Sequence, residues 1–115
     1  MDSILNSVKK LLGISTDLTA FDTDIVIHIN SALMSLSQLG IGPKEGYRIS
    51  DNKATWNGFL GNSENLEAVK SYVYMKVRLI FDPPTNSFVI DAFKKEIAEL
   101  EWRLNVQVEG GSTNE

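Results

Sequence analysis

The sequence predicts a single all-α domain in which four helices surround one hydrophobic core. Its 115 residues are 43% hydrophobic and 23% charged, which is the balance of a folded chain long enough for one core. Apolar residues also recur at the three- and four-residue spacing of amphipathic helices in four separate segments. We therefore expect a single helical domain over residues 1–104, followed by a flexible tail over residues 105–115.

The first helix is predicted at the N-terminus. Asp2 or Ser3 is placed to cap its start, and Gly13 to end it. The segment lacks the order of a signal peptide, and no run in the chain approaches the roughly 20 apolar residues that span a bilayer. We therefore expect a soluble protein without a membrane segment. The apolar stripe of this helix consists of Ile4, Leu5, Val8, Leu11 and Leu12.

The second helix is predicted from about Asp24 to Leu39, with Gly40 ending it. The stretch DIVIHI alternates like a strand, but the apolar stripe continues at helical spacing far beyond it, which favours a helix. Asp22 and Asp24 form a D-x-D pair without further oxygen ligands at calcium-loop spacing, so we interpret them as helix-capping carboxylates. The stripe consists of Ile25, Ile29, Ala32, Leu36 and Leu39.

A long connection, residues 40–62, precedes the third helix. It exceeds the roughly 12 to 15 residues beyond which structureless loops become uncommon. The segments YRI and ATW, which flank Ser50–Lys53, are compatible with a small β-hairpin. The third helix is then expected from after Ser63 to Phe81, because Pro83 and Pro84 forbid its continuation.

The fourth helix is predicted to start at a cap formed by Thr85, Asn86 or Ser87 and to lose its periodicity after Leu104. Glu99 and Arg103 form a favourably ordered pair on its outer side. Its apolar stripe consists of Val89, Phe93, Ile97, Leu100 and Leu104.

Few residues of the chain suit catalysis or metal binding. There are no cysteines and a single histidine, His28, which we interpret as a packing or interface residue rather than a catalytic base. Gly40, Gly42 and Gly46 follow a helix rather than a strand, and their spacing differs from the dinucleotide fingerprint. The net charge of −4 argues against tight binding of a phosphate backbone. The sequence therefore predicts no catalytic residue, no cofactor and no metal site.

The third helix carries two apolar stripes on nearly opposite sides. A helix of this kind is either central in its own domain or shared with a partner. A four-helix bundle that buries both stripes by itself remains the alternative to a shared surface. The stripes consist of Leu66, Val69, Val73, Val77 and Ile80 on one side and Ala68, Tyr72, Met75 and Leu79 on the other.

The second helix has no Asp, Glu, Lys or Arg between Ile25 and Gly40, as in the core of a contact surface. Because a chain of this size has room for only one fully central helix, we favour a surface shared with neighbouring subunits. The predicted interface consists of Ile27, Met34, Tyr72, Met75 and Trp102.

Three stretches together resemble the head–tail connector proteins of tailed bacteriophages, the small head-completion or adaptor proteins. They are FDTDIVIHINSALMSLSQLGIGP, LEAVKSYVYMKVRLIFDPP and FKKEIAELEWRLNV, and the resemblance covers about residues 3–108. It implies a ring, commonly dodecameric, at the head–tail junction of the virion, formed from subunits that reside in the host cytoplasm before assembly. The implied partners are other copies of the chain, the portal protein and a downstream connector or tail protein. Genomic DNA would pass through the channel without sequence-specific binding.

We also predict functions for two further segments. Val106 and Val108 alternate as in an extended strand that could add to a sheet edge of a partner, and the resemblance also points to a C-terminal segment that docks on the portal. The loop with Tyr47, Ile49 and Trp56 is assigned to the tail side.

Two other functions remain as alternatives. A small helical regulator of a protein or nucleic acid would require a basic helix face, yet Lys70, Lys76 and Arg78 fall on different sides of the third helix. An enzyme would have to rely on His28.

Overall fold

The computed structural model describes residues 3–61 and 64–113, and within them the chain is all-α, as predicted. These residues contain no sheet, only an isolated bridge between Ser3 and Thr55. The helices are α1 (Ile4–Leu12), α2 (Asp22–Gln38), α3 (Trp56–Leu60), α4 (Leu66–Phe81) and α5 (Ser87–Thr113).

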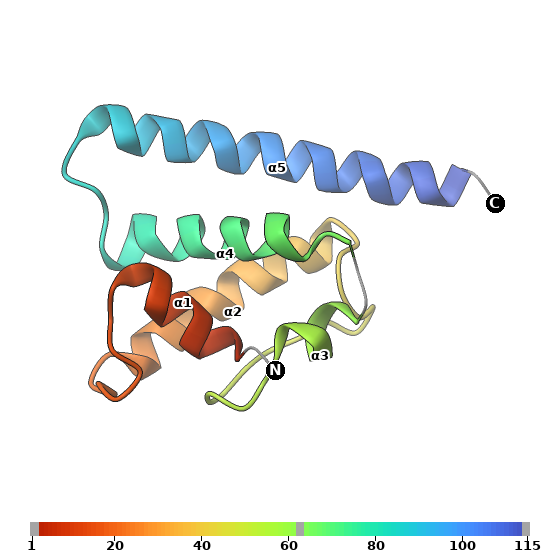
Figure 1. Cartoon of the computed structure of the whole chain (residues 1–115). Helices are drawn as coiled ribbons and strands as arrows, with labels where there is room; N and C mark the ends of the chain where they lie inside the picture. The colour runs from red at the N-terminus through yellow and green to blue at the C-terminus, as the bar shows by residue number, and fades with distance from the viewer. Residues whose placement is uncertain (1–2, 62–63, 114–115) are drawn as a thin grey trace.

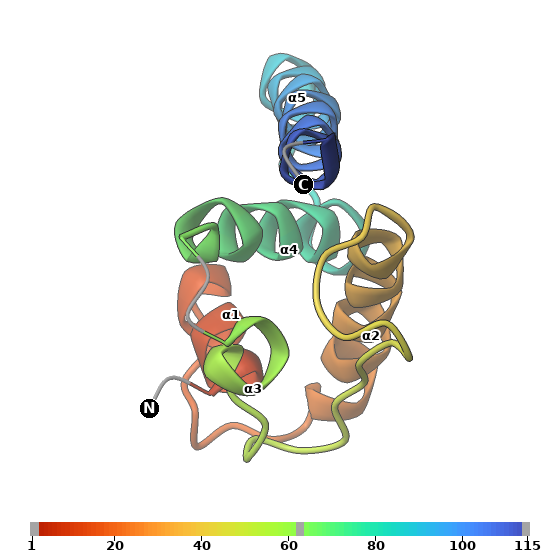
Figure 2. The ribbon, with the colours of Figure 1, turned by 90° about the vertical axis from the view of Figure 1, so that its right-hand side faces the viewer.

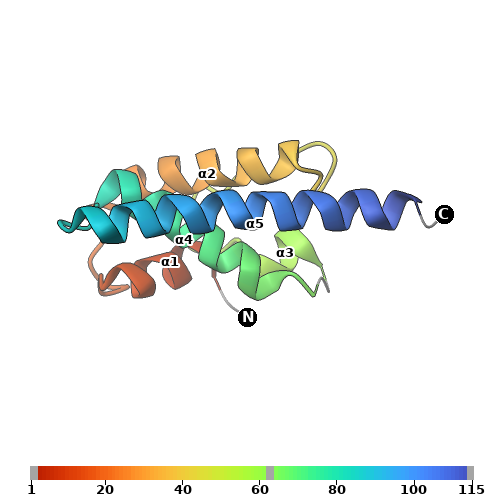
Figure 3. The ribbon, with the colours of Figure 1, turned by 90° about the horizontal axis from the view of Figure 1, so that it is seen from above.

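Helix α4 lies in the middle of the molecule. The long helix α5 packs on one side of it, and α1, α2 and α3 lie on the other side (Figures 1 and 2). Seen from above, α5 runs between α2 on one flank and α1 and α3 on the other (Figure 3). The contacts of α4 with α1, α2 and α5 make it the helix around which the core is built.

Both apolar stripes of α4 are used inside the chain. Val69, Val73 and Val77 are fully buried, as is Tyr72 on the other side, and Met75 is 7% exposed. The burial of Tyr72 and Met75 corrects the expectation that they face a neighbouring subunit, because α5 covers a side of α4 that a bundle without it would expose. The alternative of a central helix therefore holds for α4.

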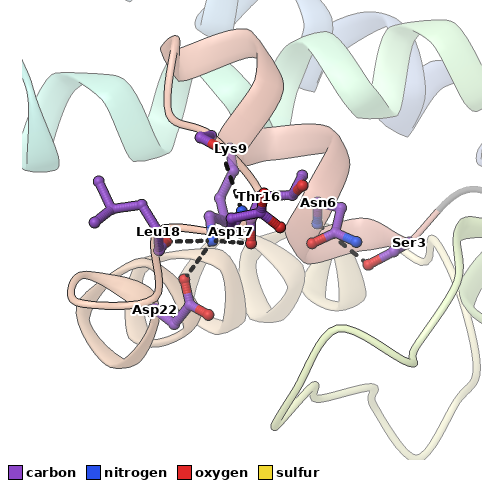
Figure 4. A network of polar contacts seen from close by, with 8 residues as sticks. Ser3, Asn6, Lys9, Thr16, Asp17, Leu18 and Asp22 are labelled. Atoms are coloured by element: carbon purple, nitrogen blue, oxygen red, sulfur yellow. Dashed lines mark hydrogen bonds and ion pairs between the residues drawn. The ribbon is translucent and has the colours of Figure 1, made fainter.

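The start and end of α1 follow the predicted signals. The backbone N–H of Asn6 donates to Ser3 Oγ at 3.2 Å, so Ser3 is the cap (Figure 4), whereas Asp2 lies outside the described residues. Gly13 ends the helix with φ of 81°, a left-handed conformation that glycine adopts without steric cost.

Helix α1 is joined to the start of α2 by a buried ammonium group. Lys9 is 1% exposed, and its Nζ lies 2.8 Å from Asp22 Oδ1 while donating to the carbonyl oxygens of Leu18 at 2.6 Å and Thr16 at 3.3 Å (Figure 4). The prediction that Asp22 and Asp24 cap α2 is wrong, and both carboxylates lie in the first turn of the helix instead. The helix has Phe21 as its cap residue without a side-chain cap bond, because the Asp22 carboxylate neutralises Lys9 instead.

The connection between α2 and α4 contains a short helix rather than the predicted hairpin. The backbone N–H of Gly58 donates to Thr55 Oγ1 at 3.0 Å, which caps α3 and turns Trp56 into the core. The backbone of Ile49 pairs with the side-chain amide of Asn30, which accepts from the Ile49 N–H at 2.8 Å and donates to the Ile49 carbonyl at 3.0 Å. The Asn30 side chain thus forms the hydrogen bonds with Ile49 that the second strand of a hairpin would have formed.

Helix α5 starts as expected but ends later. The N–H of Phe88 donates to Asn86 Oδ1 at 2.8 Å, which confirms a cap in the predicted segment. The helix continues to Thr113, so the predicted end at Leu104 is wrong, and Val106 and Val108 are helical rather than extended in the single chain. The reason is that Val108 continues the core-facing spacing of the helix and packs against the main core.

Candidate interaction surfaces

The outer face of α2 exposes apolar side chains to solvent. Ile27 and Met34 are 57% and 61% exposed, whereas Ile25, Ile29 and Leu36 on the opposite side are fully buried. Two turns of helix separate Ile27 from Met34, so their side chains lie on one line along the surface. We define the α2 outer face as Ile27, Asn30, Ser31 and Met34.

A groove runs between this face and the loop that follows α2. Its volume is about 620 Å³. The Asn30–Ile49 pairing fixes the loop against the helix, and the ring of Tyr47 packs at a tilt against that of Phe59, with 5.4 Å between the ring centroids. These contacts hold the groove open without a partner. Its lining consists of Ile27, Asn30, Ser31, Met34, Ser37, Glu45, Gly46, Tyr47 and Arg48.

A second exposed apolar surface lies on α5. Phe88 is 82% exposed, Trp102 67% and Val106 43%, and the helical spacing places them on the side of α5 opposite the buried Ile97. Lys95 and Glu99 lie between these apolar side chains along the helix. We define the α5 outer face as Phe88, Ala92, Lys95, Glu99, Trp102 and Val106.

The inner face of α5 is fixed to α4 by apolar and polar contacts. Ile97, Leu100 and Leu104 are at most 8% exposed. The buried hydroxyl of Tyr72 donates to a carboxylate oxygen of Glu101 at 2.6 Å. Burial raises the pKa of Tyr72 well above its ordinary value, and the neighbouring negative charge of Glu101 raises this pKa further. The orientation of the α5 outer face is therefore set by the core.

Basic side chains of α4 are engaged in contacts of their own. Arg78 donates to the hydroxyl of Tyr74 at 2.8 Å and lies over the ring of Phe93 at 5.8 Å. Lys76 lies over the ring of Tyr72 at 5.6 Å. These contacts do not build the single basic face that a nucleic-acid-binding helix requires.

The structure separates the residues that were predicted as sites. Of the predicted subunit interface, Ile27, Met34 and Trp102 are exposed, whereas Tyr72 and Met75 are buried.

The predicted portal-docking and tail-side sites also contain both exposed and buried residues. Val106 of the portal-docking segment is exposed and Val108 is half-buried. In the loop assigned to the tail side, Tyr47 is half-buried, while Ile49 and Trp56 are 4% and 2% exposed.

Two surface residues were missed by the sequence reasoning. Phe88 is the most exposed large apolar residue described, and its position off the stripe of Val89 and Phe93 was the available signal. Arg48 lines the groove from the loop, and no sequence pattern connects it with α2.

Residues 3–61 and 64–113 contain no group of three or more His, Cys, Asp or Glu that could hold a metal ion. No helix in these ranges is long and apolar enough to cross a membrane. His28 is half-buried on α2.

Comparison with curated proteins and with solved structures gave no match. The family model described as phage connector protein matches residues 4–111, which include nearly the whole of the helical structure. This match confirms the resemblance carried by the three helical stretches, and it points to a structural rather than an enzymatic component of the phage particle. The chain belongs to the phage connector protein family.

Proposed function

We propose that the protein forms a ring between the portal and the tail, extends the DNA channel and joins head to tail. The observation that carries this proposal is the presence of two different exposed apolar faces on one chain of the phage connector family. A ring requires such a pair, because each subunit contacts its two neighbours through different surfaces. The α2 and α5 outer faces lie on different helices in different layers of the molecule (Figure 2).

In this proposal, Ile27 and Met34 of one subunit contact Trp102 of the next. Large apolar and aromatic side chains are the usual anchors of protein interfaces. The groove beside Met34, bounded by Tyr47 and Arg48, offers a concave surface for such an anchor. Tyr72 and Met75 are left out of the contact because they are buried within the subunit.

The C-terminal part of α5 is proposed to dock on the portal protein, and the loop over residues 41–55 to meet the next connector or tail protein. Val106 is the exposed apolar residue of the docking segment, while Val108 anchors the segment to the subunit. From the loop, Tyr47 is the partly exposed ring, whereas Ile49 and Trp56 support the loop from inside. The negative net charge suits a channel that does not grip the phosphates of passing DNA.

Electron microscopy of portal rings mixed with the protein tests this function. We expect an added collar on the portal. Met34→Glu and Trp102→Glu should each abolish the collar while leaving the melting temperature unchanged, because a charge tolerated in water would be buried unpaired in the contact. Ile80→Glu is the matched control, since Ile80 is 60% exposed on neither of the two faces.

Two outcomes would contradict the proposal. Normal collars with both Glu variants would remove the two faces from the subunit contact. A chain ending at Leu104 that still decorates portals at full occupancy would remove the C-terminal segment from portal docking.

A further inference from the structure

The exposed residues of the α5 outer face follow a regular spacing. Along the helix they are alternately four and three residues apart, which is the spacing of a coiled-coil seam. The seam lies opposite the buried inner face of Ile97, Leu100 and Leu104. Its members are Phe88, Ala92, Lys95, Glu99, Trp102 and Val106.

Two copies of this seam are complementary when they run antiparallel with their Ile97 residues at the same level. Phe88 and Val106 lie at equal distances on either side of Ile97, as do the small Ala92 and the large Trp102. Lys95 and Glu99 form the innermost pair, and Glu99 also forms an ion pair with Arg103 of its own helix. In an antiparallel pair of helices these residues face each other in layers. Each layer then joins apolar with apolar, small with large, or positive with negative side chains.

A parallel arrangement lacks this complementarity. It would place Lys95 opposite Lys95, Glu99 opposite Glu99 and Trp102 opposite Trp102 of the second copy. Facing like charges destabilise a contact, so the charge pattern selects the antiparallel orientation.

We propose that the α5 outer face of the free protein pairs antiparallel with the same face of a second copy of this chain. The seam from Phe88 to Val106 is about 27 Å long at the rise of an α-helix. Because α5 is the outermost layer, the rest of each subunit points away from the contact (Figure 2). Charged layers in the middle of a seam fix its register and lower its stability, so the pair is weak and depends on protein concentration.

The pairing has a consequence for assembly that rests on the proposed ring function. Trp102 cannot contact a second α5 and the α2 outer face of a ring neighbour at the same time. A two-fold pair uses the same face on both copies and therefore closes without extending to a ring. The dimer would thus keep subunits from joining a ring until contact with the portal replaces the contact between the two α5 helices.

Sedimentation velocity of the full chain, from about 1 µM to about 1 mM, tests the pairing. We expect the wild type to change from monomer to dimer over this range. Lys95→Glu and Glu99→Lys should each move the monomer-to-dimer transition to a concentration at least about tenfold higher. Each variant places like charges in both central layers of the dimer. An equimolar mixture of the two variants should pair like the wild type, since every central layer of the mixed dimer again joins Lys with Glu.

Two controls accompany this experiment. Lys94→Glu makes the same charge change one residue away from the seam, and it should leave the dimer unaffected. Quenching of tryptophan fluorescence by acrylamide gives a second readout. It should decrease as the protein is concentrated, because Trp102 is 67% exposed in the single chain while Trp56 is already 2% exposed.

Three results would overturn the pairing. They are a wild type that stays monomeric over the whole range, a variant mixture that does not regain the dimer, and a Trp102 that stays equally accessible. A monomeric wild type whose seam variants lose attachment to portal rings would assign the α5 outer face to another virion protein. Pairing without collars on portals would leave this inference standing and contradict the proposed function instead.

Discussion

The body formed by α1, α2 and α4 and the layer formed by α5 are built from similarly apolar helical segments, yet they bury them differently. Helix α4 has neighbours on both sides, and both of its apolar stripes, apart from the exposed Ile80, are in the core or packed against it. Helix α5 has the body on one side only, and Phe88 and Trp102 on its other side are 82% and 67% exposed. The apolar pattern of a helix thus shows which surfaces need a partner, and the packing shows whether the chain itself supplies one.

The two regions also differ in how polar groups fix them. The body encloses the ammonium group of Lys9, which Asp22 and two backbone carbonyls satisfy. The α5 layer is positioned by the bond from Tyr72 to Glu101 and by Val108 at its far end. The Lys9 ammonium has three polar partners, whereas the Tyr72 hydroxyl has one, so we expect a larger loss of stability when the Lys9 contacts are removed.

Truncation of core side chains should give the largest effect. Leu36→Ala in α2 should lower the free energy of unfolding by about 2–5 kcal/mol, as should Leu100→Ala on the inner face of α5. Phe88→Ala on the α5 outer face should change it by less than about 0.5 kcal/mol. Urea denaturation followed by circular dichroism measures all three. Similar losses for Leu100 and Phe88 would contradict the distinction between the two faces of α5.

Removal of the buried ammonium group should come next. Lys9→Met keeps most of the apolar stem and loses the bonds to Asp22 and the carbonyl oxygens, so we expect a loss of about 2 kcal/mol. The Asp22 side chain is 28% exposed as a whole, but its Oδ1 atom is buried and loses its partner when Lys9 is replaced. Lys10→Met is the matched control because Lys10 is exposed on the same helix. Equal unfolding curves for the two variants would show that the network does not stabilise the body.

The bond between α4 and α5 should have a smaller effect. Tyr72→Phe removes the hydroxyl that donates to Glu101 and should lower the free energy of unfolding by about 1.5 kcal/mol. The helix content should be unchanged, because the ring still fills its place in the core. Denaturation of the variant at neutral pH measures this loss, and an unchanged midpoint would contradict it.

The pH dependence of stability gives an independent check on Tyr72. The pKa of Tyr72 is raised in the folded chain, so its contribution to stability is complete below the ordinary tyrosine pKa of about 10. Above that pH the unfolded chain loses the proton while the folded chain retains it, and stability falls as pH rises. Denaturation between pH 8 and about pH 11 should show this fall in the wild type and a shallower one in Tyr72→Phe. Parallel pH profiles would contradict the assignment.

The smallest effect should come from the contact at the end of α5. Gly40 has φ of 91°, and a Cβ atom there would lie 3.0 Å from Val108 Cγ1. Gly46 has a similar φ of 89° with nothing within 4 Å of such an atom, so Gly46→Ala measures the backbone strain alone. Gly40→Ala should be less stable than Gly46→Ala by roughly 0.5 kcal/mol, and Val108→Ala should remove the difference. A difference that persists without Val108 would exclude this contact as its cause.

Signals within a few residues of each other determined the helical class and several helix ends. Ser3 and Gly13 bound α1, Asn86 precedes α5, and Pro83 with Pro84 stops α4. These signals act through a local hydrogen bond, a left-handed glycine or a missing N–H, none of which depends on the rest of the fold. The three helical stretches were also sufficient to indicate the connector family.

Contacts between distant residues decided what the local signals left open. Asn30 of α2 satisfies the backbone of Ile49, so a hairpin is not required there. Val108 packs on the core, so α5 continues beyond Leu104, where the apolar pattern predicted its end.

The assignment of surfaces depended on packing in the same way. The sequence identified Tyr72 and Trp102 alike as apolar residues away from the main stripes, and the tertiary structure buried the first and exposed the second. Burial depends on which helix covers a given face, and that is a property of the whole packed chain rather than of the spacing along one helix.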